Sequence, residues 1–162
     1  MEPATQTRFK PRFVDGKAMI VAGMGERITP ETWDKIDKLW WRFAPHIGKV
    51  PGQIGARVAY GAVTDAAHGI DYLAGVEVAS ASDLPDGFAH VSLPAQRYAV
   101  FNHDGHVSKL KDTMTAIWKW LPQSGHAQAR TAGAPAFFER YGEEFDPQTG
   151  MGGIEVWVPV KA

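Results

Sequence analysis

Apolar side chains recur with the spacing of an α-helix in two stretches of the chain. The first stretch has the apolar positions Trp33, Ile36, Leu39, Trp40 and Phe43. The second has Val107, Leu110, Met114, Ile117, Trp118 and Leu121. Intervals of three and four residues place such side chains on one face of a helix. The sequence therefore predicts two amphipathic helices, which end near Pro45 and Pro122 because a proline pushes the preceding residue out of the helical conformation.

The start of the first helix and the positions of the tryptophans follow from the same pattern. Thr29-Pro30-Glu31 supplies a hydroxyl cap, a proline at the first position and an acid near the positive end, so the helix is predicted to begin there. The tryptophans on the two stripes, Trp33, Trp40 and Trp118, are expected in the core. Trp41 points away from its stripe, and we expect it to close a pocket, to join a partner interface or to be an ordinary, partly covered surface residue.

Stretches with β-type character flank both helices. Residues 9–24, 57–63 and 70–79 surround the first helix, and residues 96–102, 134–141 and 153–160 surround the second. Turn-rich segments at 64–69 and 146–150 separate the last two stretches of each set. Each half of the chain therefore reads as strand, helix, strand, strand.

The two halves also match in sequence at a fixed spacing. Residues 75–78 (GVEV) return 78 positions later as residues 153–156 (GIEV), and Trp40 falls on Trp118 at the same spacing. A duplicated unit implies a pseudo-symmetric domain. We predict one α+β domain over residues 1–162, with repeat one at about 8–80 and repeat two at about 91–161. Its antiparallel sheet would carry two main helices, with a ligand cleft between the repeats.

Composition narrows the class of protein. The formal net charge is −1 and the basic residues are scattered, which argues against direct nucleic-acid binding. Cysteine is absent, so disulfides and thiolate chemistry are excluded. The first residues lack the features of a signal peptide, and no apolar run reaches the ~18 residues of a membrane span. We expect a soluble cytoplasmic protein, monomer or homodimer, without membrane contact.

Two glutamates in predicted strands are the first candidates for a site. Glu155 and Trp157 share one face of the last strand, and Glu77 lies on the matching face of the first repeat beside small residues. If both faces line the cleft, it combines carboxylates with aromatic walls, which suits a flat, apolar, cationic molecule. The alternative is that each glutamate simply faces outward from a half-exposed sheet.

A neighbouring strand supplies two further candidates, Glu139 and Tyr141, which share one face and either reach the same cleft or decorate the sheet surface. His103 and His106 are three residues apart, but no adjacent acid completes a metal set, so no metal site is expected. No phosphate-binding glycine loop, nucleophile elbow or dinucleotide fingerprint is found, and no cofactor is expected.

Several segments of the second half together match a known family. They are residues 98–101 (YAVF), Gly105, residues 117–122 (IWKWLP), 138–141 (FERY) and 154–160 (IEVWVPV). The chain resembles the GyrI-like (gyrase-inhibitor-like) domain, the effector-binding domain of AraC-type and multidrug-responsive transcription regulators. The resemblance covers nearly the whole chain and is weaker in the first half.

The resemblance implies a cleft for lipophilic, often cationic molecules, with Glu155 near the ligand charge and Trp157 lining the site. The regulators carry a helix-turn-helix domain that this sequence lacks, so we expect a stand-alone binding protein for sequestration, sensing or protection. The ligand-binding candidates are Glu155, Trp157, Tyr141, Glu77, Glu139 and Trp41. One alternative is a cofactor-independent hydrolase of electrophilic cyclopropane compounds, as in some stand-alone relatives, with Glu155 as the base. The last alternative is a protein-binding inhibitor.

Overall fold

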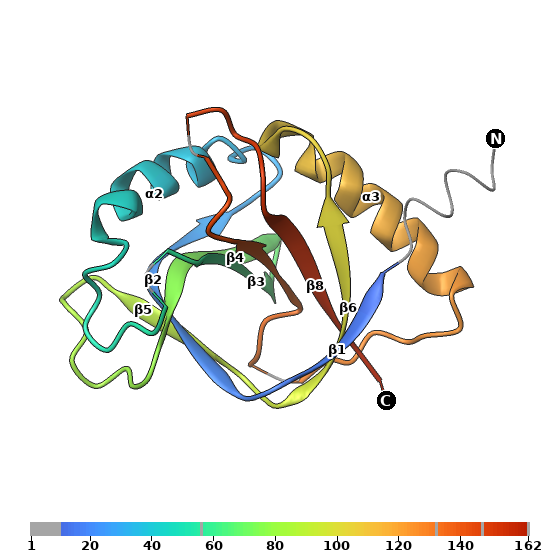
Figure 1. Ribbon diagram of the computed structural model, residues 1–162, viewed down its shortest axis with the longest axis horizontal. Helices are drawn as coiled ribbons and strands as arrows, with labels where there is room; N and C mark the ends of the chain where they lie inside the picture. The colour runs from blue at the N-terminus through green and yellow to red at the C-terminus, as the bar shows by residue number, and fades with distance from the viewer. Residues whose placement is uncertain (1–10, 56, 132, 147, 162) are drawn as a thin grey trace.

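The computed structural model describes residues 11–55, 57–131, 133–146 and 148–161. Within them, eight strands form one antiparallel sheet, and α2 (Lys35–Phe43) and α3 (Leu110–Trp120) cover the same face of it (Figure 1). The strands are β1 (Arg12–Gly16), β2 (Met19–Ile28), β3 (Ala59–Ala66), β4 (Gly69–Val78), β5 (Ala89–Leu93), β6 (Gln96–His103), β7 (Phe137–Tyr141) and β8 (Ile154–Val160). The short 3-10 helices η1 (Ala44–His46) and η3 (Leu121–Gln123) follow α2 and α3, and η2 (Val107–Lys109) precedes α3.

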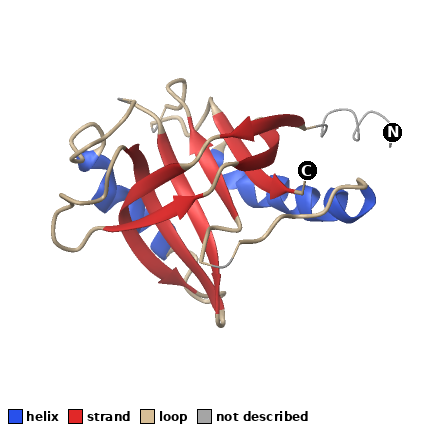
Figure 2. Ribbon diagram, turned by 90° about the horizontal axis from the view of Figure 1, so that it is seen from below, coloured by secondary structure: helices blue, strands red, loops and turns tan. Residues whose placement is uncertain are grey.

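The sheet order is β1-β6-β8-β7-β3-β4-β2-β5, so β7 and β3 join the two halves of the chain at the centre. Residues 17–18 connect β1 to β2, and residues 94–95 connect β5 to β6. Each of these two-residue links joins two strands that lie in opposite halves of the sheet. The sheet therefore curls, and the face without helices becomes concave (Figure 2). A core with members from both halves fills this concave face: Val21, Tyr60, Ala62, Leu73, Leu93, Tyr98, Val100 and Phe138.

The predicted α+β class, the antiparallel sheet and the two helices are confirmed. The predicted segment 9–24 contains two strands, β1 and the first part of β2, and β5 precedes the strands predicted for the second repeat. The repeats are therefore β1-β2-α2-β3-β4 and β5-β6-α3-β7-β8. On the helix side each repeat builds its own core, one around Leu39 and Phe43 of α2 and one around Leu110 and Ile117 of α3. The predicted β-type segment at residues 9–24 begins with two residues that lie outside the described part of the chain.

Strand register changes the spacing of the repeats at the last strand. Tyr60 pairs with Gly75, whereas Phe138, 78 positions after Tyr60, pairs with Trp157. The position equivalent to Gly75 is then Trp157, 82 positions further on, because the connection between β7 and β8 is longer than that between β3 and β4. The matching GVEV and GIEV segments, which predicted the duplication, are therefore offset by four residues in the sheet.

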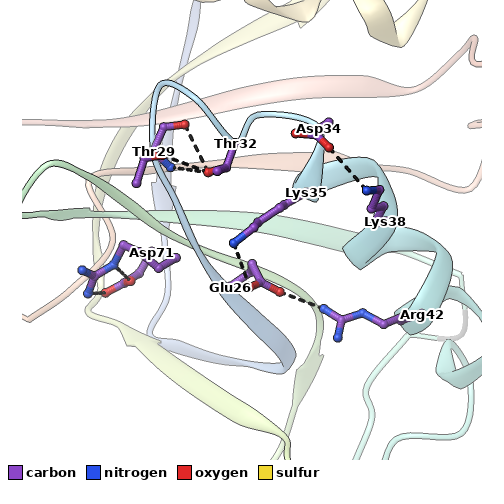
Figure 3. A network of polar contacts seen from close by, with 9 residues as sticks. Glu26, Thr29, Thr32, Asp34, Lys35, Lys38, Arg42 and Asp71 are labelled. Atoms are coloured by element: carbon purple, nitrogen blue, oxygen red, sulfur yellow. Dashed lines mark hydrogen bonds and ion pairs between the residues drawn. The ribbon is translucent and has the colours of Figure 1, made fainter.

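Helix α2 begins at Lys35, later than the predicted start near Thr29, because residues 29–34 form turns. The Thr32 hydroxyl accepts a hydrogen bond from the Thr29 backbone N–H at 2.8 Å (Figure 3). Glu26 of β2 then holds the helix against the sheet through Arg42 at 2.9 Å and Lys35 at 4.0 Å (Figure 3). These contacts fix the position of α2.

Two of the tryptophans predicted in the core are not buried. Trp33 precedes α2 and is 57% exposed, so the assignment was wrong because the helix that would have turned it inward has not yet begun. Trp118 is 37% exposed and packs only its edge against Phe137, with ring centroids 5.5 Å apart. Trp40 is half-buried and packs on both helix-side cores. Within the described residues, neither helix has the length and apolar character needed to span a bilayer.

Candidate functional site

A pocket opens on the helix side where the two repeats meet, and we call it the seam pocket. It has a volume of about 470 Å³. Its lining comes from α2 and η1, from the segment entering β3, from η2, and from the end of β7 and the residues after it. The lining residues are Asp37, Trp40, Trp41, Ala44, Ile47, Arg57, Ala59, Val107, Tyr141, Gly142, Glu143 and Phe145. The seam pocket therefore lies between the repeats, as a cleft was predicted to lie.

Aromatic rings form much of the wall. Tyr141 meets Trp40 edge-on at 5.3 Å between ring centroids and Phe145 at 5.1 Å. Trp41, on the next position of α2, is 80% exposed and presents its indole at the rim. Because the two helix-side cores are separate, only partly buried side chains fill the space between them, and the pocket remains where those side chains stop.

Directly behind the Tyr141 wall is a carboxylate held by tyrosines, the tyrosine–carboxylate cluster of Glu139, Tyr72 and Tyr141. The Tyr72 hydroxyl donates to Glu139 Oε1 at 2.7 Å and the Tyr141 hydroxyl donates to the same oxygen at 2.9 Å. The Trp40 indole N–H donates to the Tyr72 hydroxyl at 2.9 Å, which ties α2 to the cluster. Gly61 of β3 makes room, because a Cβ there would overlap the Tyr72 hydroxyl and lie 2.6 Å from Glu139 Oε1.

The charge of Glu139 is not neutralised by a basic residue. No lysine, arginine or histidine of the described ranges forms an ion pair with it. Burial raises the pKa of Glu139 above its ordinary value, and the two tyrosine hydroxyls, which favour the anion, offset only part of that effect. Burial also raises the pKa of Tyr72 and of Tyr141 well above the usual value, so both remain hydroxyl donors.

The second carboxylate oxygen of Glu139 accepts no hydrogen bond from the described residues. Both hydrogen bonds to Glu139 end on Oε1. No buried side-chain oxygen or nitrogen in the described part of the chain lacks a hydrogen-bond partner. Oε2 therefore retains accessible surface, and a partner with a positive charge or a hydrogen-bond donor would satisfy it.

Glu155 lies on the concave face, away from the seam pocket. Its Oε2 accepts from Arg12 at 2.8 Å, and its Oε1 accepts from the Trp157 indole at 2.9 Å and lies 3.7 Å from Arg140. Burial raises the pKa of Glu155, but the hydrogen bonds from Arg12 and Trp157 and the charges of both arginines outweigh it, so the pKa lies below its ordinary value. This carboxylate is already paired.

The aromatic partner of Glu155 is also committed to packing. Trp157 stacks on Phe138 with ring centroids 5.3 Å apart and meets Tyr98 edge-on at the same distance. Glu77 is half-buried on the same concave face, opposite Val21 of β2, and its charge acts on the Tyr60 hydroxyl. Arg140 pairs in register with Tyr60 of β3 and with Glu155 of β8, so Tyr60, Arg140 and Glu155 follow one another across the sheet.

The structure thus divides the six predicted ligand-binding residues between two faces. Tyr141 and Trp41 line the seam pocket and Glu139 lies directly behind its wall, whereas Glu155, Trp157 and Glu77 lie on the concave face. Their roles in binding stay predictions. Sequence reasoning missed Tyr72, Phe145 and Asp37. Alternation along β7 gives no signal for them, because Tyr72 lies in β4, Asp37 in α2 and Phe145 after β7.

The two histidines considered for a metal have other partners. The His103 ring contacts the Thr113 hydroxyl at 2.6 Å through Nδ1 and the His106 carbonyl at 2.8 Å through Nε2. Across the described residues, no three His, Cys, Asp or Glu side chains converge as a metal site would require.

Comparison with known proteins identifies the family of the chain. The GyrI-like small molecule binding domain family matches residues 9–161, and the chain belongs to this family. It is 30% identical over 151 residues to the transcriptional regulator BrlR of Pseudomonas aeruginosa. The aligned region covers 92% of this chain and 54% of BrlR. The chain therefore spans about half the length of that relative.

Solved structures share the fold. The structure of SAV2435 bound to tetraphenylphosphonium superimposes with a TM-score of 0.75 at 19% identity, covering 94% of both chains. EcmrR in a complex with DNA superimposes with a TM-score of 0.72 at 14% identity, covering 99% of this chain and 61% of EcmrR. At these identities the likeness concerns the fold.

Proposed function

We propose that the chain binds lipophilic aromatic cations in the seam pocket and that Glu139 supplies the opposing negative charge. The observation that carries this proposal is a glutamate enclosed by tyrosines, without an arginine or lysine partner in the described residues, directly behind an aromatic pocket wall. A buried anion without a cation is costly to maintain, so its retention favours a ligand that provides the charge.

The shape and chemistry of the pocket support the same class of ligand. A volume of about 470 Å³ lies within the range that holds drug-sized molecules. The π-faces of Trp40, Trp41 and Tyr141 attract cations, and they offer apolar area to a flat ligand. A charge placed against this wall is one side chain away from Glu139, where the low dielectric strengthens the attraction.

Tetraphenylphosphonium is a suitable probe, since the related SAV2435 binds it. We expect it to bind the seam pocket, whereas tetraphenylborate, of the same shape and opposite charge, should bind at least ten times more weakly. Isothermal titration calorimetry measures both affinities. Equal affinity for the two ions, or no binding of the cation, would contradict the proposal.

A matched pair of variants tests which glutamate supplies the negative charge that binds the ligand. Glu139→Gln keeps an oxygen that can accept from Tyr72 and Tyr141 but removes the negative charge, so tetraphenylphosphonium affinity should fall about tenfold or more. Glu155→Gln removes the same charge from the concave face and should change the affinity less than twofold. The reverse result would show that Glu155, and not Glu139, lies opposite the positive charge of the ligand.

A hydrolase is the second candidate, because the raised pKa of Glu139 suits a general base and Oε2 is free to accept a proton. Water would attack an electrophilic cyclopropane carbon while the strained ring C–C bond at that carbon breaks, and Glu139 would take a proton from the water. The electron pair of the broken bond would pass into the conjugated ligand, which is then protonated. Mass spectrometry after incubation with cyclopropane-bearing alkylators tests this role. Product formed by the wild type and lost in Glu139→Gln supports it, and stoichiometric binding without product contradicts it.

A further inference from the structure

The rim of the seam pocket carries one carboxylate from each repeat. Asp37 lies on α2 of the first repeat, and Glu143 lies just after β7 of the second repeat. Both line the pocket, and both are exposed. The negative charge of Asp37 contributes to the raised pKa of Tyr141, whose main cause is burial, so Asp37 faces the same wall that covers Glu139.

These two acids differ from the acids elsewhere on the surface near α2 and β4. Asp34 pairs with Lys38 at 3.4 Å, Glu26 with Arg42 at 2.9 Å and Asp71 with Arg27 at 2.5 Å (Figure 3). Asp37 and Glu143 form no ion pair and accept no side-chain hydrogen bond within the described ranges. Their charges are therefore available to a ligand.

Negative charge thus occurs at two depths, with aromatic rings between them. Glu139 is the inner charge, Tyr141 and Trp40 form the wall in front of it, and Asp37 and Glu143 form the outer pair. Among the described lining residues Arg57 carries the one positive charge, so the outer groups remain net negative. The exposed indole of Trp41 adds a cation-binding face at the same rim.

From this arrangement we infer that the seam pocket selects elongated aromatic dications, with one charge opposite Glu139 and the second between Asp37 and Glu143 at the rim. The inference rests on the proposed function and names its ligand class. A monocation satisfies only the inner carboxylate, so the outer pair adds affinity only to a ligand with a second charge at the rim. Because the outer carboxylates are exposed, each contributes modestly and the preference weakens as salt increases.

A ligand series tests the inference: an N-alkylquinolinium monocation and bis-quinolinium dications joined by chains of four to ten methylenes. At low salt the best dication should bind the wild type about ten times more tightly than the monocation, beyond the factor of about two expected from its two equivalent heads. The preference should depend on linker length and shrink at high salt. Calorimetry gives the affinities.

Variants of the rim residues test whether Asp37 and Glu143 cause the preference for dications. Asp37→Asn with Glu143→Gln should reduce the dication preference to about twofold, because the loss of dication affinity should exceed any loss of tetraphenylphosphonium affinity. Arg57→Gln should increase the dication preference. Asp34→Asn is the control: Asp34 is the N-cap residue of α2, three positions before Asp37, and is already paired with Lys38, so the dication preference should stay unchanged.

The outcomes separate this inference from the function on which it rests. If tetraphenylphosphonium binds and depends on Glu139, but dications show only the twofold statistical gain, the dication selectivity is wrong and the cation pocket stands. If the preference persists in the double variant, the rim carboxylates are not its source. If no cation binds the wild type, the proposed function itself fails.

Discussion

Glu139 and Glu155 lie on neighbouring strands, β7 and β8, and face opposite sides of the sheet. Glu139 is held by two neutral hydroxyls, whereas Glu155 is held by an indole N–H and two arginines. The pKa of Glu139 is raised, mainly by burial, and that of Glu155 is lowered because its partners outweigh burial. The two carboxylates therefore differ in their partners: Glu155 is paired with arginines, and Glu139 has only hydroxyl partners among the described residues.

The two faces of the sheet also differ in how their cores are built. The concave face has one continuous core shared by both halves, with Tyr60, Tyr98, Phe138 and Trp157 in ring contact. The helix side has two cores, one under each helix, that meet only through partly buried side chains such as Trp40, Ile47 and Phe137. The concave face is thus filled by one core, while the boundary between the two helix-side cores leaves space for the seam pocket.

The strongest test of this difference is a cavity in the concave core. Phe138 is 1% exposed and packs against three aromatic rings there. Phe138→Ala should lower the free energy of unfolding by about 3–5 kcal/mol, the usual cost of truncating a buried phenylalanine. Urea denaturation measures the loss. The folded variant should still bind tetraphenylphosphonium, and a selective loss of binding at unchanged stability would place the ligand on the concave face.

A smaller loss of stability is expected when Gly61, which lies against the tyrosine–carboxylate cluster, is replaced by a larger residue. Gly61→Ala would force its new methyl group against the Tyr72 hydroxyl and Glu139 Oε1, at a cost of about 1–3 kcal/mol. Cation affinity should fall as well. Gly25→Ala in β2 is the control, because its Cβ would approach Leu73 Cδ1 no closer than 3.6 Å. Equal stability and equal cation affinity of the two variants would show that the cluster does not depend on the space left at Gly61.

The smallest effect concerns pH and has opposite signs for the two glutamates. Since the folded pKa of Glu155 is lowered, its contribution is present above the ordinary glutamate range and is lost as pH falls through the lowered value. Glu155→Gln should cost about 1 kcal/mol at pH 7, reduced by solvent because Arg12 is half exposed. In urea titrations the cost should shrink as pH falls below the ordinary glutamate range.

Glu139 should behave in reverse. Its folded pKa is raised, so its protonated form favours the folded state and that stabilisation is lost as pH rises through the raised value. Glu139→Gln should therefore gain stability relative to the wild type as pH increases from 4 to 7, whereas cation binding by the wild type should strengthen over the same range. Parallel pH profiles for both variants would contradict the distinction between the two carboxylates.

Much of the fold followed from residues that are close in sequence. The 3.6-residue stripes of α2 and α3 and the strands around them were predictable because apolar periodicity reflects burial directly. The GyrI-like family was recognisable from the segments near the C-terminus. The turn at residues 29–34 was not predicted, because Thr32 provides the local hydrogen bonds in place of an earlier helical turn.

By itself the sequence determined the α+β class, the two-repeat order and a set of acids and aromatics that included Glu139, Tyr141 and Trp41. Which acid stands behind a pocket was decided only by the tertiary structure. Alternation along a strand shows that Glu139 and Glu155 occupy defined faces, but it does not show which face the helices cover or where an arginine 143 positions away will lie. Those contacts depend on the register of β7 with β3 and of β1 with β6, which forms only when the two halves of the chain come together.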